Sequence, residues 1–262
     1  MIRAILGLAG LTLRTFGSGR RAAAAAFLLG LPPVLALVAA LAPEARAPEV
    51  FRQIVFYVTL WFVVYLLGVI YGLSLSSGEI EDGTAGYLFL SALPRWLTVL
   101  VQAGVTAAAL GALLGASLLL TALAARAAGG PFPALARDVG VCTLAGGAGI
   151  VIALGYAMTC GFAFRHPRGA MTAAVAPVFF WELMVTWWPV KFAAYTVTNN
   201  VRAVLRTLLF EGRPGRVFKY VRNFELPEYA EASVFLSALA GLALAAAMVA
   251  AMNRSIEGKE AR

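Results

Sequence analysis

Three carboxylates, Glu79, Glu81 and Asp82, lie within four residues of one another in a 262-residue chain with only 13% charged side chains. They belong to the stretch 76–96, SSGEIEDGTAGYLFLSALPRW, a polar island between two long apolar runs. Acids are favoured in the first turn of a helix by the positive end of its dipole. The aromatic residues that follow suit a membrane interface. We therefore predict a short interfacial helix that presents its acids to a cytosolic partner.

A fourth carboxylate, Glu182, lies well inside an apolar run. Counting from Ala170 at about 1.5 Å per residue places it roughly 18 Å deep in a membrane. A charge at that depth is costly unless it is paired, protonated or facing water, so such residues are functional candidates. Glu182, with Thr186 four residues later, is thus a candidate for a translocation path. The alternative is a protonated or hydrogen-bonded glutamate near an outer aromatic belt.

Other chemistry is excluded by the residues that would have to perform it. His166 is the only histidine, so no His cluster exists to bind a metal. The three lysines, Lys191, Lys219 and Lys259, are followed by Phe, Tyr and Glu. None completes the Gly-x4-Gly-Lys-Ser/Thr phosphate loop. We expect no catalytic residue, no metal, no bound cofactor and no nucleic-acid partner for this chain.

The elements that position these residues are transmembrane helices. The chain is 61% hydrophobic and its mean hydropathy is +0.83, which is not the balance of a soluble domain of this size. A bilayer core about 30 Å thick needs roughly 20 apolar residues of helix, and lipid leaves no backbone group unpaired. The six predicted spans are 22–42, 54–75, 96–125, 139–164, 170–190 and 232–252. We predict an all-α polytopic membrane protein that forms one domain over residues 1–262.

Two further elements are predicted outside the spans. Residues 1–19 alternate apolar residues with Arg3 and Arg14, which predicts a basic amphipathic helix in the headgroup layer. Residues 195–229 predict a short helical hairpin at the outer surface. Its basic side chains are Arg202, Arg206, Arg213, Arg216, Lys219 and Arg222. These side chains either form a collar for an anionic substrate, lipid headgroups or an external partner, or anchor the hairpin by snorkelling.

Charge and small residues predict orientation and packing. The residues before the first span are Arg14, Arg20 and Arg21, and those after it are Glu44, Arg46 and Glu49. This charge bias places the N-terminus in the cytoplasm. An even number of spans then places both termini there. Small residues four apart, such as Gly111 with Gly115 and Gly149 with Ala153, favour close helix packing.

The polar island resembles the segment between the second and third spans of the ABC-2 family of ABC transporter permeases. The family pattern is an acid-rich E-x-E-x-G-T, then leucines, then Pro and Arg. The matching residues here are Glu79, Glu81, Gly83, Thr84, Leu88, Pro94 and Arg95. The Gly-Lys that often follows the motif is Val101-Gln102 in this chain. The six-span layout, the N-terminal helix and the interrupted outer segment extend the resemblance loosely over the whole chain.

This resemblance implies a function and a set of partners. It implies that residues 79–90 include a coupling helix seated in a cleft of a separate cytoplasmic ATPase subunit, which binds the ATP and magnesium. It also implies a second permease copy, with the translocation path at the interface, in a bacterial cytoplasmic membrane. We therefore expect the membrane subunit of an ATP-driven exporter of a lipid-like, glycan or hydrophobic substrate.

Two alternatives to this permease remain open from the sequence. The first is a non-transporting subunit that passes ATPase movement to an external partner through residues 195–229. The second is an ion-coupled carrier that uses Glu182. Inverted repeats and broken helices would favour the carrier, and the two halves of the sequence show no convincing repeat.

Overall fold

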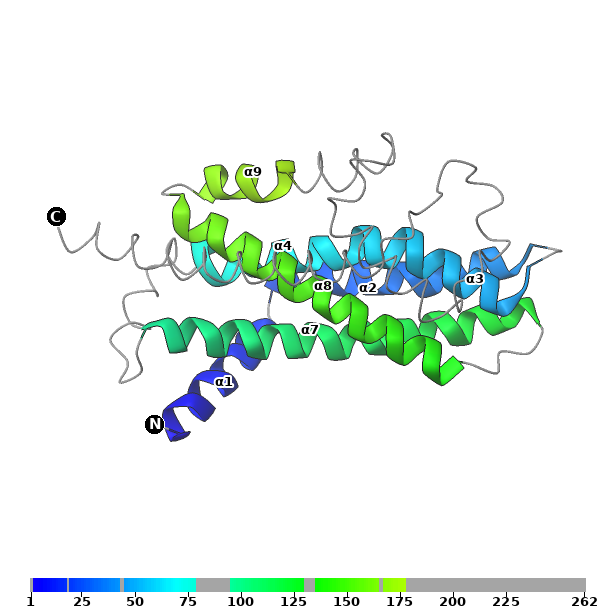
Figure 1. The fold of residues 1–262 in the computed structure, drawn as a ribbon, viewed down its shortest axis with the longest axis horizontal. Coiled ribbons are helices and arrows are strands. Elements are labelled where there is room, and N and C mark those ends of the chain that lie inside the picture. The colour runs from blue at the N-terminus through cyan, green and yellow to red at the C-terminus, as the bar shows by residue number, and fades with distance from the viewer. Residues whose placement is uncertain are drawn as a thin grey trace, which may run out of the picture.

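The computed structural model describes residues 2–17, 19–42, 45–78, 95–129, 135–164 and 167–177 (Figure 1). The regular structure of these ranges is entirely helical. Four helices are long and apolar enough to cross a membrane: Gly19–Ala40, Ala47–Ser76, Trp96–Ala128 and Leu135–Ala163. They correspond to the first four predicted spans and indicate a membrane-embedded protein. The predicted span 170–190 begins within the described residues and continues outside them, and 232–252 lies wholly outside.

The helices follow one another in a simple order along the chain. Their bounds are α1 Ile2–Phe16, α2 Gly19–Ala40, α3 Ala47–Ile54, α4 Val64–Leu73, α7 Arg95–Ala125, α8 Leu135–Ala163 and α9 Pro167–Pro177. A π-helical stretch, η1 Val55–Val63, joins α3 to α4, and the N–H of Val64 donates to the carbonyl of Thr59 five residues earlier. A second π-helical stretch, η2 Ser74–Gly78, ends this span, and a short 3-10 turn, η3 Arg126–Ala128, ends α7.

The spans pack chiefly in three pairs, α2 with α7, α7 with α8, and α4 with α8. The pair of α4 and α8 is parallel. A Cβ added to Gly72 would lie 2.7 Å from the carbonyl oxygen of Leu154, and one added to Gly149 would lie 2.8 Å from Cγ1 of Val64. Gly149 and its neighbour Ala153 therefore lie at a close helix contact, as their spacing predicts.

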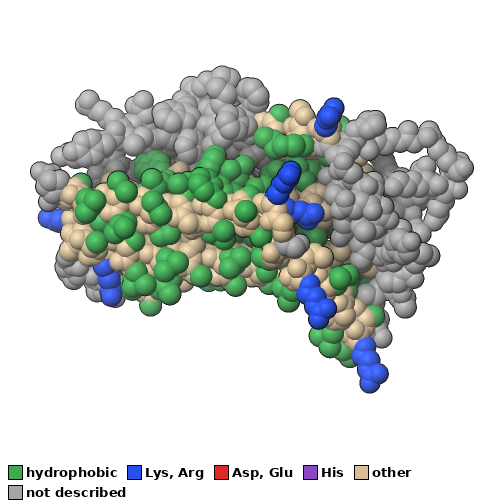
Figure 2. All heavy atoms as spheres, turned by 180° about the vertical axis from the view of Figure 1, so that it is seen from behind, with side chains coloured by type: hydrophobic (Ala, Val, Ile, Leu, Met, Phe, Trp, Pro, Cys, Tyr) green, Lys and Arg blue, Asp and Glu red, His purple; other side chains and the backbone are tan. Residues whose placement is uncertain are grey.

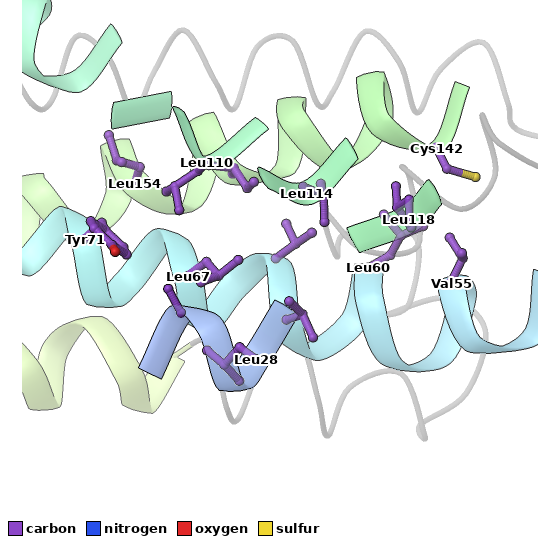
Figure 3. Packing of buried hydrophobic residues seen from close by; sticks show 14 of the residues in the cluster. Leu28, Val55, Leu60, Leu67, Tyr71, Leu110, Leu114, Leu118, Cys142 and Leu154 are labelled. Atoms are coloured by element: carbon purple, nitrogen blue, oxygen red, sulfur yellow. The ribbon is translucent and has the colours of Figure 1, made fainter. Parts of the chain in front are cut away.

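The core lies between α7, α8 and the second span. Leu110, Leu114 and Leu118, four residues apart on α7, are fully buried. Figure 3 shows this row facing Leu60 and Leu67 of the second span. Glycine lets the row approach α8, since a Cβ on Gly146 would lie 2.5 Å from Cδ2 of Leu114. Dispersion contacts across this seam replace the hydrophobic drive that lipid does not supply.

The bundle has two ends, named here by the short helices that mark them. The α1 end contains α1, the start of α2 and α7, and the last turns of α4 and α8 (Figure 1). The α3 end contains α3, η3 and the start of α8. Between them, 22–40, 53–76, 96–125 and 139–163 contain no Asp, Glu, Lys or Arg. Figure 2 shows the resulting apolar middle, with arginine side chains toward the two ends.

Candidate functional site

The acidic part of the polar island, residues 79–94 and here called the acidic island, is attached at the α1 end. The second span ends at Gly78 and α7 begins at Arg95, and both helix ends lie where α1 lies (Figure 1). The predicted coupling residues between them lie outside the described residues: Glu79, Glu81, Asp82, Gly83, Thr84, Leu88 and Pro94. The structure therefore gives the attachment points of the island and the contacts just ahead of it.

Those contacts tie three elements together. The rings of Phe16 in α1 and Tyr71 in α4 stack with centroids 4.6 Å apart and planes inclined by 24°. The Tyr71 hydroxyl also donates to the carbonyl of Phe16 at 3.3 Å. One turn further on, the guanidinium of Arg21 at the start of α2 donates to the hydroxyl of Ser74. The N-terminal helix and the first span are thus joined to the last turns before the acidic island.

The N-terminal helix has the two surfaces that a membrane interface requires. Thr12 is buried against the bundle, where its hydroxyl donates to the Leu8 carbonyl at 2.9 Å. Ile2 and Leu6 are 74% and 66% exposed, one turn apart on a different face. Arg3 and Arg14 are also exposed. The helix predicted within residues 1–19 is confirmed, and its exposed apolar and basic side chains are typical of the headgroup layer, where its location stays a prediction.

The α3 end is held by an ion pair between two spans. Nη2 of Arg52 in α3 lies 3.2 Å from Oδ2 of Asp138 in the first turn of α8, and Nε lies 3.3 Å from the same oxygen. The Asp138 side chain is 2% exposed and that of Arg52 is 22% exposed. The N–H of Ala47 also donates to the carbonyl of Gly129 at 3.3 Å. The charged residues at the ends of the apolar runs signalled such a pair, but the sequence prediction did not include it.

A proline pair inside α2 was also missing from the sequence prediction. Pro32 and Pro33 lie inside α2, and Pro33 has no N–H to donate to the Leu29 carbonyl four residues earlier. The hydroxyl of Ser117 in α7 donates to that carbonyl at 2.5 Å. A neighbouring helix therefore satisfies the freed backbone group, which lipid could not do.

The remaining predicted site residues lie outside the described residues. They are Glu182 and Thr186 of the predicted translocation path, and Arg202, Arg206, Arg213, Arg216, Lys219 and Arg222 of the outer basic segment. Arg95 begins α7, and only its backbone is described. Across the described ranges, no three His, Cys, Asp or Glu side chains group together in a way that could hold a metal ion.

Comparison with protein-family models and with curated proteins finds no match to this chain. The features of this chain that bear on its function are the acidic island of residues 79–94 and the contacts that join α1 and α2 to the second span at its attachment point.

Proposed function

We propose that this chain is the membrane subunit of an ATP-driven exporter of the ABC-2 permease type. The proposal starts from the resemblance of residues 79–95 to the coupling segment of that family. The observation that carries it further is the attachment of this segment after Gly78, within two turns of Tyr71 and Ser74, which tie α1 and α2 to the second span. A partner that pulls on the acidic island thereby acts on the first two spans together.

The contacts at the α1 end give a physical route for that movement. Tyr71 and Ser74 lie on consecutive turns, and they bind Phe16 of α1 and Arg21 of α2 respectively. Packed helices respond to a displaced end by rigid-body tilting, since their cores are not continuously deformable. ATP hydrolysis in a separate subunit then opens access to the path without a catalytic residue in this chain.

The charges of the described residues support a cytoplasmic α1 end. The charged side chains described at that end are all basic: Arg3, Arg14, Arg20, Arg21 and Arg168. Those described at the α3 end have both signs: Arg46, Glu49, Arg52, Arg126, Arg137 and Asp138. An excess of arginine is typical of short loops on the cytoplasmic side of a membrane. This orientation presents the acidic island to a cytosolic ATPase and keeps both termini inside.

The apolar character of the described spans is compatible with the proposed substrate class. Their membrane-depth residues carry no charge, so a path along their surfaces suits a lipid-like or otherwise hydrophobic molecule, including a glycan on a lipid carrier. A second permease copy would complete the path at the interface of the two. The outer basic residues between 195 and 229 would then contact headgroups, an anionic substrate or an external partner.

The first test is purification of the full chain together with an ATPase that carries a phosphate loop. We expect the two to co-purify and to move a hydrophobic substrate across vesicles only with ATP. Glu81→Arg should abolish that transport, because it reverses the charge presented to the ATPase, while Glu260→Arg makes the same change outside the island and should have no effect. A failure to find any co-purifying ATPase would contradict the proposal. ATP-independent transport lost in Glu182→Gln would favour the ion-coupled carrier.

A further inference from the structure

An apolar groove of about 400 Å³ lies between the elbow of α1 and α2, the side of α7 and Tyr71. Its α2 wall includes Ala22, Ala26 and Gly30, and its α7 wall includes Leu113. Ligand pockets in proteins have volumes of about 300–1,000 Å³. The groove is thus large enough for a small apolar ligand, and it is not part of the acidic island or of the Arg52 ion pair.

The groove exists because α2 presents small side chains where it passes α7. A Cβ added to Gly30 would meet no atom within 4 Å. The Ser117 hydroxyl covers the Leu29 carbonyl that Pro33 leaves free, so this polar group of the wall is already satisfied. What remains is an apolar surface, which favours a hydrocarbon occupant.

The length of the groove matches one leaflet of a bilayer. It follows α2 from Ala22 to Pro33, a distance of about 16 Å at about 1.5 Å per residue. Half of a hydrocarbon core about 30 Å thick is about 15 Å. The groove therefore begins at the interface on the α1 side and ends near the bilayer centre, as a single extended acyl chain does.

The mouth of the groove is basic. Arg20 and Arg21 immediately precede Ala22, and both are exposed. Arg21 is held near the mouth by its hydrogen bond to Ser74, one turn beyond the groove residue Tyr71. Gly19, at φ +72°, makes the elbow that brings Phe16 and the arginines to the same place, a conformation that favours glycine.

We infer that this groove binds one acyl chain of an anionic phospholipid from the surrounding membrane, with the headgroup phosphate on Arg20 and Arg21. Apolar walls, a length of one leaflet and basic residues at the interface together select that occupant over a zwitterionic lipid or a soluble ligand. The bound chain would fill the space between α1, α2 and α7 and so stabilise the elbow. The inference does not depend on the proposed transport function.

Photo-crosslinking of the full chain in nanodiscs tests the position of the acyl chain. The probe is phosphatidylglycerol with a diazirine in one acyl chain, and cross-linked peptides are mapped by mass spectrometry. We expect labelling concentrated on 22–33 and 113–120, with several-fold less in Gly30→Leu, whose side chain fills the groove. Gly147→Leu, at another glycine with open space around it, should label as the wild type does. If labelling of the wild-type chain is spread evenly over its lipid-facing surface, that result alone overturns the inference.

Competition tests the headgroup. Unlabelled phosphatidylglycerol should displace the probe better than phosphatidylcholine does, by about fivefold for each arginine that contacts the phosphate. Arg20→Gln should lower the preference for phosphatidylglycerol over phosphatidylcholine about fivefold. Arg126→Gln replaces an exposed arginine at the α3 end and should leave this preference unchanged. Equal displacement by the two lipids in the wild-type chain would overturn the anionic assignment.

Discussion

The two ends of the bundle are held together by different chemistry. At the α3 end, Arg52 reaches a nearly fully buried Asp138 at 3.2 Å. At the α1 end, a ring stack joins Phe16 to Tyr71, and a hydrogen bond to an uncharged hydroxyl joins Arg21 to Ser74. Breaking a buried ion pair strands a charge, at a cost of about 3–5 kcal/mol. An aromatic pair contributes only about 0.5–1.5 kcal/mol beyond its buried area.

This difference indicates which end is able to move. An element that opens by local rearrangement is drawn from the weakly held part of a structure. At the α1 end, where the acidic island is attached, the contacts of α1 and α2 with the second span are the weaker ones. Under the proposed function, ATPase movement enters at the end with the weaker contacts, and the ion pair between α3 and α8 acts as the pivot.

The largest expected effect comes from breaking that pivot. Arg52→Leu should lower the free energy of unfolding by about 3 kcal/mol, because it leaves the Asp138 carboxylate buried beside an apolar side chain. Thermal and denaturant unfolding in detergent micelles measure the loss. The double variant Arg52→Leu with Asp138→Leu should recover most of it, since an apolar pair replaces the ion pair without a stranded charge.

The control for this experiment is Arg126→Leu, which removes an exposed arginine at the same end. Surface changes of this kind stay within about 0.5 kcal/mol. If Arg52→Leu costs no more than Arg126→Leu, the α3 end is not held by its ion pair and the two ends do not differ as described.

The four described spans were predictable, because an apolar run of about 20 residues has no stable alternative to a helix in lipid. Their ends were less so. The second span begins at Ala47 and not near Ile54, since Pro48 suits the first turn of a helix. The fourth begins at Leu135, because Asp138 in its first turn is satisfied by an arginine 86 residues away. A hydropathy pattern cannot include that distant partner.

The contacts of the candidate site were unpredictable for the same reason. Phe16 and Tyr71 are 55 residues apart, and Ser117 and Leu29 are 88 apart. Pro33 signals that the Leu29 carbonyl needs a donor, but nothing local indicates that Ser117 supplies it. The signal of the acidic island is carried by adjacent residues and needs no knowledge of the helix register, but these residues lie outside the described ranges and the island stays a prediction.

The second prediction concerns the close contact between α4 and α8, which reaches the α1 end. Gly72→Ala should destabilise the protein by about 1–3 kcal/mol, because the new Cβ lies 2.7 Å from a backbone oxygen of Leu154 that cannot move aside. Gly155→Ala is the matched control, since a Cβ there meets nothing within 4 Å. Thermal unfolding of the two variants compares them directly. Equal stability would mean that α4 is able to separate from α8, so that the weak contacts of the α1 end are not confined to α1 and α2.

The third prediction addresses the ring stack. Phe16→Leu keeps apolar bulk but loses the contact with the Tyr71 ring, so stability should fall by about 1 kcal/mol. Hydrogen exchange should become faster in α1 and stay unchanged in α3. Phe27→Leu, on an α2 residue that is 71% exposed, should change neither. Exchange that rises equally at both ends would show that they open as one unit and would remove the contrast between them.

The smallest expected effect lies between the two ends, at the proline pair inside α2. Ser117→Ala should cost about 0.6 kcal/mol, a typical value for a hydrogen bond between membrane helices. Pro33→Leu restores a backbone N–H for the Leu29 carbonyl, so in that background Ser117→Ala should cost almost nothing. A double-mutant cycle by thermal unfolding isolates this coupling. If the two changes are additive, Ser117 does not serve the carbonyl that proline frees.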